Sequence, residues 1–475
     1  MMNTLILPST TTTNRMRRYS IFLACCAALH TGSVNSAEVP DPLQLNGIKE
    51  GILTPNQLEM GRLINAVCSS RNADQNFLDR CDALANARGT TEGALSNEDL
   101  AGILKKVTDG QNFAKNNPKK NTNSTLSNRI AAIRTGRQSG GLQLSGLMFD
   151  SNGNPVSLSQ LAKLNTSSNK AAAGDNSFDR LGIFVNGNIG FGDRRTTVNE
   201  YGYNQDTHGA TAGIDYRFTD HFLLGTAFSY NNTRTGYTNS LGSMDTDSFS
   251  GALYGSFFTD NGFFVDGIFS GSHLDYSSKR NIQYTLSTDT KVGGLVNTDG
   301  TGKNQGTEFN VAMTSGFNFN KGGLTLTPQL RVDYTNTQVG AMDENKTNNL
   351  KDGWALHVDQ QSFESLQTAA GLQLAYAINL PWGVISPMVR AEYIHEFLND
   401  SRNIHVYALG DKNTAKINAN LKTDNPDRDF IVASAGLSAQ FAHGISAFVN
   451  YDTVQAHSYI NNHNFSGGVR VELPF

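Results

Sequence analysis

The feature that most constrains this chain is an alternation of apolar and polar residues with a period of two, from about residue 178 to the C-terminus. It is clearest over residues 324–334 (LTLTPQLRVDY), where apolar and polar side chains alternate almost without exception. Side chains of a β-strand point alternately to its two faces, so this segment predicts a strand with one apolar and one polar face. The same alternation recurs in segments 210–218, 309–317, 366–378, 385–393, 431–441, 445–451 and 465–475.

The connections between these strands indicate where the apolar faces point. Tight turns at 219–220, 259–262, 321–323, 380–383 and 442–444 alternate with long polar stretches at 275–306, 335–363 and 398–428. Short turns at one end and long loops at the other are typical of outer-membrane β-barrels, whose apolar faces contact lipid. Aromatic residues lie near predicted strand ends, as at Tyr216, Phe218, Tyr334, Tyr393 and Tyr451. We therefore predict an all-β transmembrane barrel of about twelve antiparallel strands over residues 178–475, closed because hydrocarbon cannot pair with a free sheet edge.

Composition supports a membrane barrel over a soluble enzyme. Charged residues make up only 17% of the chain, whereas soluble proteins average about 25%. The formal net charge is −4, which does not favour binding to nucleic acid. Beyond the N-terminal region the sequence has no run of 18 apolar residues, the minimum for a membrane-spanning helix.

The N-terminus predicts a secretory signal peptide over residues 1–36. Three arginines precede a short apolar core at residues 21–29 (IFLACCAAL), and the sequence VNSA then places the cleavage site between Ser36 and Ala37. A start at Met16 would give a signal of more usual length. The chain is therefore expected to leave the cytoplasm through the Sec export machinery.

Residues 37–110 predict a small helical unit. A capping box at 54–57 begins one helix, a second apolar face follows at 77–84, and a third helix begins at Ser96. Cys68 and Cys81 lie on the inward faces of the first two helices, and in an oxidising compartment such a pair favours a disulfide. Residues 111–177 are rich in Asn, Lys, Gly and Ser and predict a linker, with a helix around 125–138.

Four motifs resemble the autotransporter β-domain family: a hairpin at 254–276, AEYIHEF at 391–397, GVRVELPF at 468–475, and NRIAAIRTG at 128–136 just before the barrel. The resemblance covers roughly residues 125–475. It implies a twelve-stranded barrel with a linker helix in its lumen, where Arg129 and Arg134 would pair with charges of the wall. It also implies that the last strand is the assembly signal, carried by Val469, Val471, Leu473 and Phe475. Pro474 is unusual in that position, and the helical unit is far shorter than the passengers of this family.

The resemblance implies a protein of the Gram-negative outer membrane that anchors, and translocates or displays, its own N-terminal segment. Its expected partners are outer-membrane lipid, the barrel-assembly machinery and periplasmic chaperones, and the barrel is expected to be monomeric. A porin-like channel with an N-terminal plug and an outer-membrane barrel enzyme are the alternatives. No GxSxG motif occurs, and His395-Glu396 lacks the second histidine of a zinc HExxH site. The sequence therefore predicts no catalytic residue, no cofactor and no metal ligand.

Overall fold

The computed structural model describes residues 41, 43–45, 51–89, 96–108, 180–286, 294–344, 354–425, 427–441 and 445–473. The predicted signal peptide with Ser36 and Ala37, the predicted linker helix with Arg129 and Arg134, the turn at 442–444 and Phe475 all lie outside these residues. No helix of the described residues is long and apolar enough to cross a membrane.

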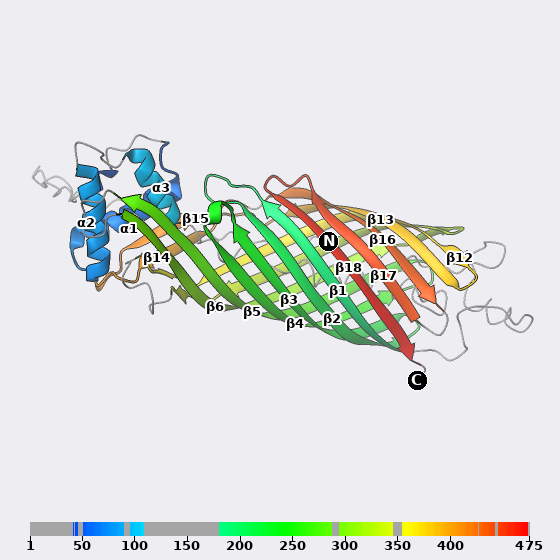
Figure 1. The fold of residues 1–475 in the computed structure, drawn as a ribbon. Helices are drawn as coiled ribbons and strands as arrows, with labels where there is room; N and C mark the ends of the chain where they lie inside the picture. Colours follow the sequence, from blue (N-terminus) through cyan, green and yellow to red (C-terminus); the bar gives the residue numbers. More distant parts are fainter. Residues whose placement is uncertain are drawn as a thin grey trace, which may run out of the picture. The chain divides into compact units, whose positions relative to one another are not determined.

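Twelve long strands among the described residues form a closed antiparallel barrel (Figure 1), which confirms the predicted fold class. The ring closes because β18 pairs with β1 and β8 pairs with β11. Two short strands, β7 (Phe319–Lys321) and β12 (Ile378–Leu380), extend it beside the short turns. The twelve strands are β1 (Leu181–Arg194), β2 (Tyr203–Thr219), β3 (Phe222–Tyr237), β4 (Gly242–Phe258), β5 (Phe263–Leu286), β6 (Gly294–Phe317), β8 (Leu324–Val339), β11 (Gln361–Tyr376), β13 (Gly383–Glu396), β16 (Asp429–Phe441), β17 (Ile445–Gln455) and β18 (Ile460–Leu473).

The alternation of β8 is realised as predicted, with Leu330 and Val332 exposed on the outside and Thr325 and Thr327 buried on the inside. Aromatic pairs bound this apolar outer surface at both ends. Beside the short turns they are Phe218–Phe222, Phe317–Phe319 and Trp382–Phe441, and towards the other end they are Tyr230–Phe249, Phe269–Phe309 and Tyr451–Phe465. Such belts mark the two membrane–water interfaces of an outer-membrane barrel.

Two prolines lie in barrel strands, where a missing N–H would normally break the ladder. Pro328 lies opposite the break between β6 and β7, since the ladder from β6 ends at Gly316↔Gln329 and resumes with β7 at Phe319↔Leu326. Pro387 similarly lies just beyond the last β11–β13 pair, Ala375↔Met388. Both prolines therefore occupy positions where the neighbouring strand is interrupted.

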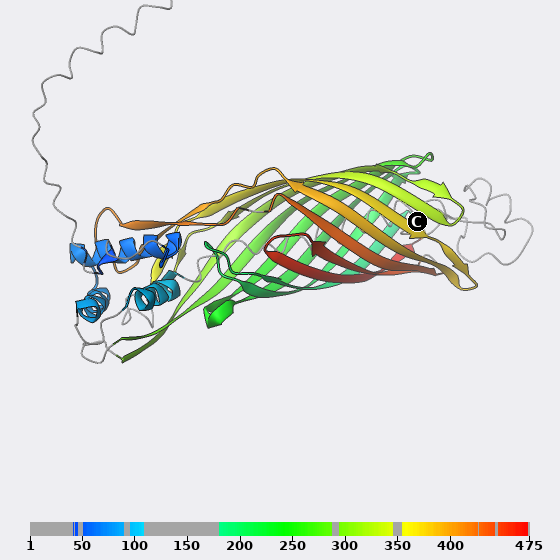
Figure 2. The ribbon, with the colours of Figure 1, turned by 90° about the horizontal axis from the view of Figure 1, so that it is seen from above.

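The prediction of a long loop at 275–306 is wrong for most of that segment, whose described residues belong to β5 and β6. β5 and β6 stay paired to Leu286↔Gly294, so the hairpin continues well past Phe269 and Phe309 of the aromatic belt. The ribbon in Figure 2 shows these strands extending towards the helices. The polar composition of the segment suggested a loop because, in water, the outward face no longer needs apolar side chains. The two strands remain paired there, although the sequence lacks the outward-facing apolar residues by which membrane strands are recognised.

The other two predicted loops contain a second sheet, which we call the outer sheet. It has the order β15–β14–β10–β9, and its strands are β9 (Met342–Asp343), β10 (Leu356–Val358), β14 (Asn403–Ala408) and β15 (Asn418–Lys422). An isolated bridge between Gly302 and Glu344 joins it to β6. The described parts of the long connections at this end are therefore structured.

Three helices form the helical unit: α1 (Pro55–Ser70), α2 (Gln75–Gly89) and α3 (Asn97–Thr108). Thr54 and Gln57 make the predicted capping box at the start of α1. Ser96 caps α3, because its Oγ accepts from the backbone N–H of Asp99 at 3.0 Å. These contacts satisfy amide groups that the first turn of a helix leaves unpaired.

Candidate functional site: the helical unit on the outer sheet

The helical unit and the outer sheet share one apolar core, together with the ends of β5 and β6. Phe77 of α2 meets Trp354 edge to face, with ring centroids 5.6 Å apart, and Trp354 donates from Nε1 to the hydroxyl of Tyr284 on β5 at 2.9 Å. The buried members include Met60, Leu63, Ile64, Leu84 and Leu104 from the helices, Leu356, Ile404, Val406 and Leu421 from the outer sheet, and Ile282, Leu286 and Val296 from β5 and β6. The apolar helix faces predicted from spacing are thus buried largely against the barrel's own extensions.

Asn56 links the start of α1 to the edge of the outer sheet. Its Nδ2 donates to the carbonyls of Asn199 and Lys422, both at 2.9 Å, and its Oδ1 accepts from the N–H of Lys422 at 2.8 Å. The side chain thereby takes the place of a neighbouring strand beside β15. This contact protects a sheet edge that would otherwise be open to other chains.

The turn between α1 and α2 makes a second polar contact with the loop after β14. The N–H of Asp74 donates to the Gly410 carbonyl at 2.8 Å, and the N–H of Lys412 donates to the Asn72 carbonyl at 2.9 Å. Asp411, almost fully buried, shapes that loop by accepting from the N–H of Ile417 at 3.1 Å. Main-chain bonds of this kind fix the orientation of the helical unit.

The predicted disulfide is present, because Cys68 of α1 is bonded to Cys81 of α2. It spans 13 residues of sequence and encloses the turn that contacts Gly410 and Lys412. A crosslink over such a short loop is expected to stabilise a unit too small to have a large core of its own.

Replacing both cysteines with serine should therefore destabilise the helical unit by about 3 kcal/mol. The expected result is faster proteolysis within residues 55–89 of the purified protein, while the barrel keeps its heat-dependent gel mobility. Reducing the wild-type protein with dithiothreitol serves as the chemical control and should act in the same direction. Unchanged proteolysis in both samples would show that the disulfide does not stabilise this unit.

A buried ion pair fixes the outer sheet to β5. Arg280 donates from Nε to Oε1 of Glu344 at 2.8 Å and from Nη2 to the Trp354 carbonyl at 2.9 Å, and Glu344 also accepts from the N–H of Leu356 at 2.9 Å. The two side chains are 1% and 2% exposed. A buried pair whose remaining hydrogen bonds are also satisfied is costly to break from one side only.

A second charged group orders the loop between β1 and β2. Arg194 forms ion pairs with Glu200 and with Asp424, at 2.5 Å from the latter. Asp424 also accepts a hydrogen bond from Nδ2 of Asn199. The carbonyl of Asn199 in turn accepts the hydrogen bond from Nδ2 of Asn56. Burial opposes ionisation of Asp424, but hydrogen bonds from Thr197 and Arg194 outweigh it and hold the pKa of this carboxyl below its ordinary value.

This depressed pKa predicts an acid-sensitive contact. A carboxyl whose pKa is lower in the folded state stabilises that state above its unfolded pKa of about 4, and the stabilisation is lost as pH falls through the folded pKa. Fluorescence of Trp354 in a Trp382→Phe background should therefore stay constant from pH 7 to about pH 4 and change on further acidification. Asp424→Asn should already resemble the acidified protein at pH 7. Identical pH profiles for the two proteins would contradict this role of Asp424.

The barrel lumen carries its own ion pairs on the inward faces of the strands. Arg470 lies 2.7 Å from Asp215 and 3.1 Å from Glu472, while Arg331 pairs with Glu392 at 3.2 Å. On the C-terminal strand Val469 and Val471 point outward, 55% and 41% exposed, and Leu473 is half-buried. The described positions of this strand thus alternate between the outer and the inner face of the barrel.

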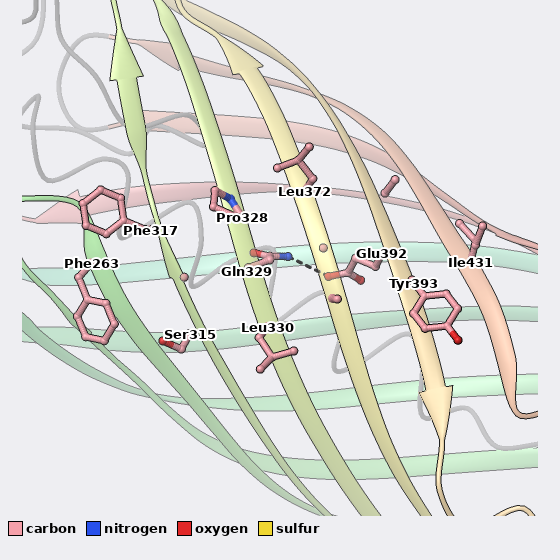
Figure 3. A pocket seen from close by; sticks show the side chains of 14 residues that line it. Phe263, Ser315, Phe317, Pro328, Gln329, Leu330, Leu372, Glu392, Tyr393 and Ile431 are labelled. Atoms are coloured by element: carbon pink, nitrogen blue, oxygen red, sulfur yellow. Dashed lines mark hydrogen bonds between the residues drawn. The ribbon is translucent and has the colours of Figure 1, made fainter.

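A groove of about 880 Å³ crosses the outer wall over β6, β8, β11 and β13 (Figure 3). Large side chains border it, Leu330, Leu372 and Tyr393 among them, while Ala370 and Ala391 leave it hollow. Gln329 and Glu392, hydrogen-bonded at 2.9 Å, belong to the inward face beneath it. The groove faces the lipid zone, and its lining is overwhelmingly apolar.

His395 and Glu396 have structural partners. The Nδ1 of His395 lies 2.7 Å from Oδ1 of Asp429, and Glu396 accepts from the N–H groups of Leu366 and Leu398. Within the described ranges no group of three or more His, Cys, Asp or Glu side chains could hold a metal ion.

A closed ring of strands with an apolar outside, a polar inside and two aromatic belts defines a transmembrane β-barrel of the outer-membrane class. A model of the family described as autotransporter beta-domain matches residues 183–452, more than half of the chain. The chain belongs to the autotransporter β-domain family.

Individual relatives are distant. The chain is 24% identical over 208 residues to the putative uncharacterized protein YaiT of Escherichia coli K12; the match covers 43% of this chain and only 19% of that protein. Among solved structures, the translocator domain of autotransporter NalP from Neisseria meningitidis is 14% identical with a TM-score of 0.47, covering 66% of this chain and 94% of that domain. The β-domain of the Bordetella autotransporter BrkA is 15% identical with a TM-score of 0.43, covering 62% and 100%.

The residues that join the helical unit to the barrel were not predicted. The role of Arg280 could have been inferred from the sequence. Arg280 places a charge on a strand face that is otherwise apolar, formed by Leu274, Tyr276, Ile282, Tyr284 and Leu286. A charge in that position suggests a buried partner. Asn56, Glu344 and Asp424 carry no such signal, since polar residues in loops and helix starts are ordinary.

Proposed function

We propose that this outer-membrane barrel displays its own N-terminal helical unit on the cell surface and retains it there. The observation that carries the proposal is the apolar core shared by the helices and the outer sheet. The outer sheet is formed by the long connections of the barrel, and in outer-membrane barrels the long loops face the cell exterior. A unit packed on them would lie outside the cell.

Chain connectivity supports passage of the unit through the barrel. Leu181 at the start of β1 pairs with Leu473 and with Tyr216 beside a short turn, hence at the periplasmic end. Helix α3, which ends at Thr108, packs against β5, whose distal residues Ile282 to Leu286 belong to the shared core. The intervening residues must therefore connect the two ends of a closed barrel. The lumen is the route that avoids lipid, with Arg129 and Arg134 the proposed partners of its charged wall.

The shared core also supports retention. The three helices of the unit lie within residues 55–108, and units this small need disulfides or a partner to be stable. The helical unit would cross the membrane unfolded or as a thin hairpin and gain its final stability on the outer sheet. Docking would then both favour export and keep the unit on the barrel that exported it.

The proposal is tested by labelling intact cells with a membrane-impermeant maleimide. Arg62→Cys places a thiol on α1 at a side chain that is 61% exposed, and it should be labelled as fast in intact as in permeabilised cells. Asp260→Cys, whose side chain is 84% exposed on a short turn, is the periplasmic control and should react only after permeabilisation. Labelling of Arg62→Cys only in permeabilised cells would overturn the proposal.

A further inference from the structure

Beyond the outer aromatic belt, a row of polar side chains crosses the outward face of four neighbouring strands. Its register pairs are His273↔Thr307 between β5 and β6, Thr307↔Gln338 between β6 and β8, and Gln338↔Ser362 between β8 and β11. All four side chains are exposed. Because alternate residues of a strand share a face, they continue the face that contacts lipid nearer the membrane centre. The polar row therefore begins where contact with lipid ends.

This row borders a cavity of about 560 Å³. Gln305 and Gln360 line the cavity on the side away from the membrane. Gly340 contributes no side chain there, and its N–H donates to the carbonyl of Gln305 at 2.8 Å. Four side chains around the cavity have no hydrogen-bond partner among the residues that the structure describes: Thr307, Gln338, Gln360 and Ser362. The cavity therefore offers free amide and hydroxyl groups to a ligand.

The chemistry of the cavity favours a neutral ligand rich in hydroxyl groups. Amides and hydroxyls both donate and accept hydrogen bonds, as the hydroxyls of a sugar do. Asp275 accepts from Nε2 of Gln305 at 2.9 Å and lies 3.5 Å from Nε2 of His273. Glu364 lies on the same outward face nearer the membrane, and Lys303 lies further out along β6. Carboxylates accept hydrogen bonds from hydroxyls but repel phosphate groups, so a sugar ring fits better than a phosphate.

The position of the cavity identifies the source of such a ring. Gln338 lies four residues beyond Tyr334, about 13 Å along the strand, and Thr307 lies two residues beyond Phe309. Phe309 meets Phe269 edge to face in the outer aromatic belt, with ring centroids 5.1 Å apart. The cavity therefore opens just outside the lipid zone, on the face that contacts the outer leaflet. In a Gram-negative outer membrane that leaflet consists of glycolipid, whose sugars lie directly above its acyl chains.

We propose that this cavity, which we call the sugar pocket, binds an uncharged sugar ring of an outer-leaflet glycolipid whose acyl chains lie against the apolar wall below. The ring of Phe309, a residue 39% exposed, offers an apolar surface to the C–H face of the sugar. Gly271, directly opposite Phe309, leaves open space between the pocket and that wall, since a Cβ there would meet only the Glu308 carbonyl oxygen, 4.0 Å away. This inference goes beyond the proposed function, because it does not require the helical unit to reach the surface.

The test is native mass spectrometry of the full-length protein, refolded into detergent and titrated with lipopolysaccharide that carries only lipid A and core sugars. Gln338→Leu removes an amide with little change in volume and should weaken binding about fivefold, the factor of one net hydrogen bond. Gln455→Leu is the matched control. Gln455 is also exposed and also lies four residues beyond a tyrosine of the belt, Tyr451, but it belongs to β17, away from the pocket. This variant should bind like the wild type.

Two further titrants separate the possible sources of the sugar. Free core oligosaccharide, which lacks acyl chains, should bind more weakly than lipopolysaccharide and lose the same factor in Gln338→Leu, whereas phosphatidylethanolamine should bind all three proteins equally. Oligosaccharide binding as tight as that of lipopolysaccharide would overturn the glycolipid as the ligand. Equal lipopolysaccharide affinities of the wild type, Gln338→Leu and Gln455→Leu would overturn the sugar pocket. If Gln338→Leu fails to fold, Thr307→Val removes a hydroxyl of the same row and should show the same loss.

Discussion

Arg280→Met should release the outer sheet and the helical unit while leaving the barrel folded in the membrane. The substitution leaves the Glu344 carboxylate buried without its cationic partner. Losing one partner of a buried ion pair costs about 3–5 kcal/mol, which is more than a hundredfold in an equilibrium constant. The Trp354 carbonyl loses its donor as well. The shared core should therefore open, and trypsin should cleave within residues 55–108 of the purified protein much faster than in the wild type.

Two further variants make this prediction specific. Lys279→Met removes the neighbouring charge, whose side chain is 51% exposed beside Asp299, and should change stability by less than about 1 kcal/mol. Combining Arg280→Met with Glu344→Leu removes both buried charges and should recover most of the protease resistance, because an apolar pair can replace a buried ion pair. Wild-type resistance in Arg280→Met alone would contradict the role assigned to the pair.

Phe475→Asp should sharply lower the amount of folded barrel. The family resemblance implies that the last strand is read as a signal by the barrel-assembly machinery, and we expect the same of this chain, in which Val469 and Val471 point outward. A charge near the membrane interface costs only about 0–1 kcal/mol, so a loss of most of the folded protein would reflect failed recognition. The measurement is the fraction of heat-modifiable protein in outer-membrane fractions.

Phe441→Asp is the matched control. Phe441 is an outward aromatic residue beside a short turn, stacked on Trp382, but it belongs to β16. Its replacement should cost about 1–2 kcal/mol from the charge and the lost stacking, and assembly should remain close to normal. If both variants assembled equally well, the C-terminal strand would not be the assembly signal.

Much of the barrel could be predicted because lipid imposes a simple rule on every strand that crosses it. Outward residues such as Leu330 must be apolar and inward residues such as Thr327 are polar, so the period and the turns identify the strands. The helices could be predicted equally well from the sequence. The capping residues Thr54 and Ser96 and the spacing of Cys68 and Cys81 depend only on residues that are close together in the chain.

The region beyond the membrane could not be predicted in the same way. Along β5 the face that carries large apolar side chains changes. Phe263 and Phe269 point outward into the lipid zone, whereas further along the strand Tyr276, Ile282 and Tyr284 point inward towards the helices. A search for outward-facing apolar residues therefore does not detect the strand beyond the membrane. The partners of Asn56 and of Arg280 lie far away in sequence, at Lys422 and Glu344, and only the folded chain brings them together.

The central claim, that the helical unit is docked on the outer sheet at the cell surface, is tested most directly by an engineered, reducible crosslink. Nδ2 of Asn72 lies 3.0 Å from Oδ1 of Asn413, so the thiols of Asn72→Cys and Asn413→Cys should be within reach of a short bis-methanethiosulfonate crosslinker, which joins them in intact cells through disulfides that a reductant cleaves. With a specific protease site inserted between residues 115 and 116, on the outer side of the predicted lumen helix, external protease and denaturing gels then report whether the N-terminal fragment stays attached. We predict that it remains attached without reductant and separates with it, whereas either single variant releases it in both conditions. Release of the fragment from the double variant without reductant would contradict docking on the outer sheet.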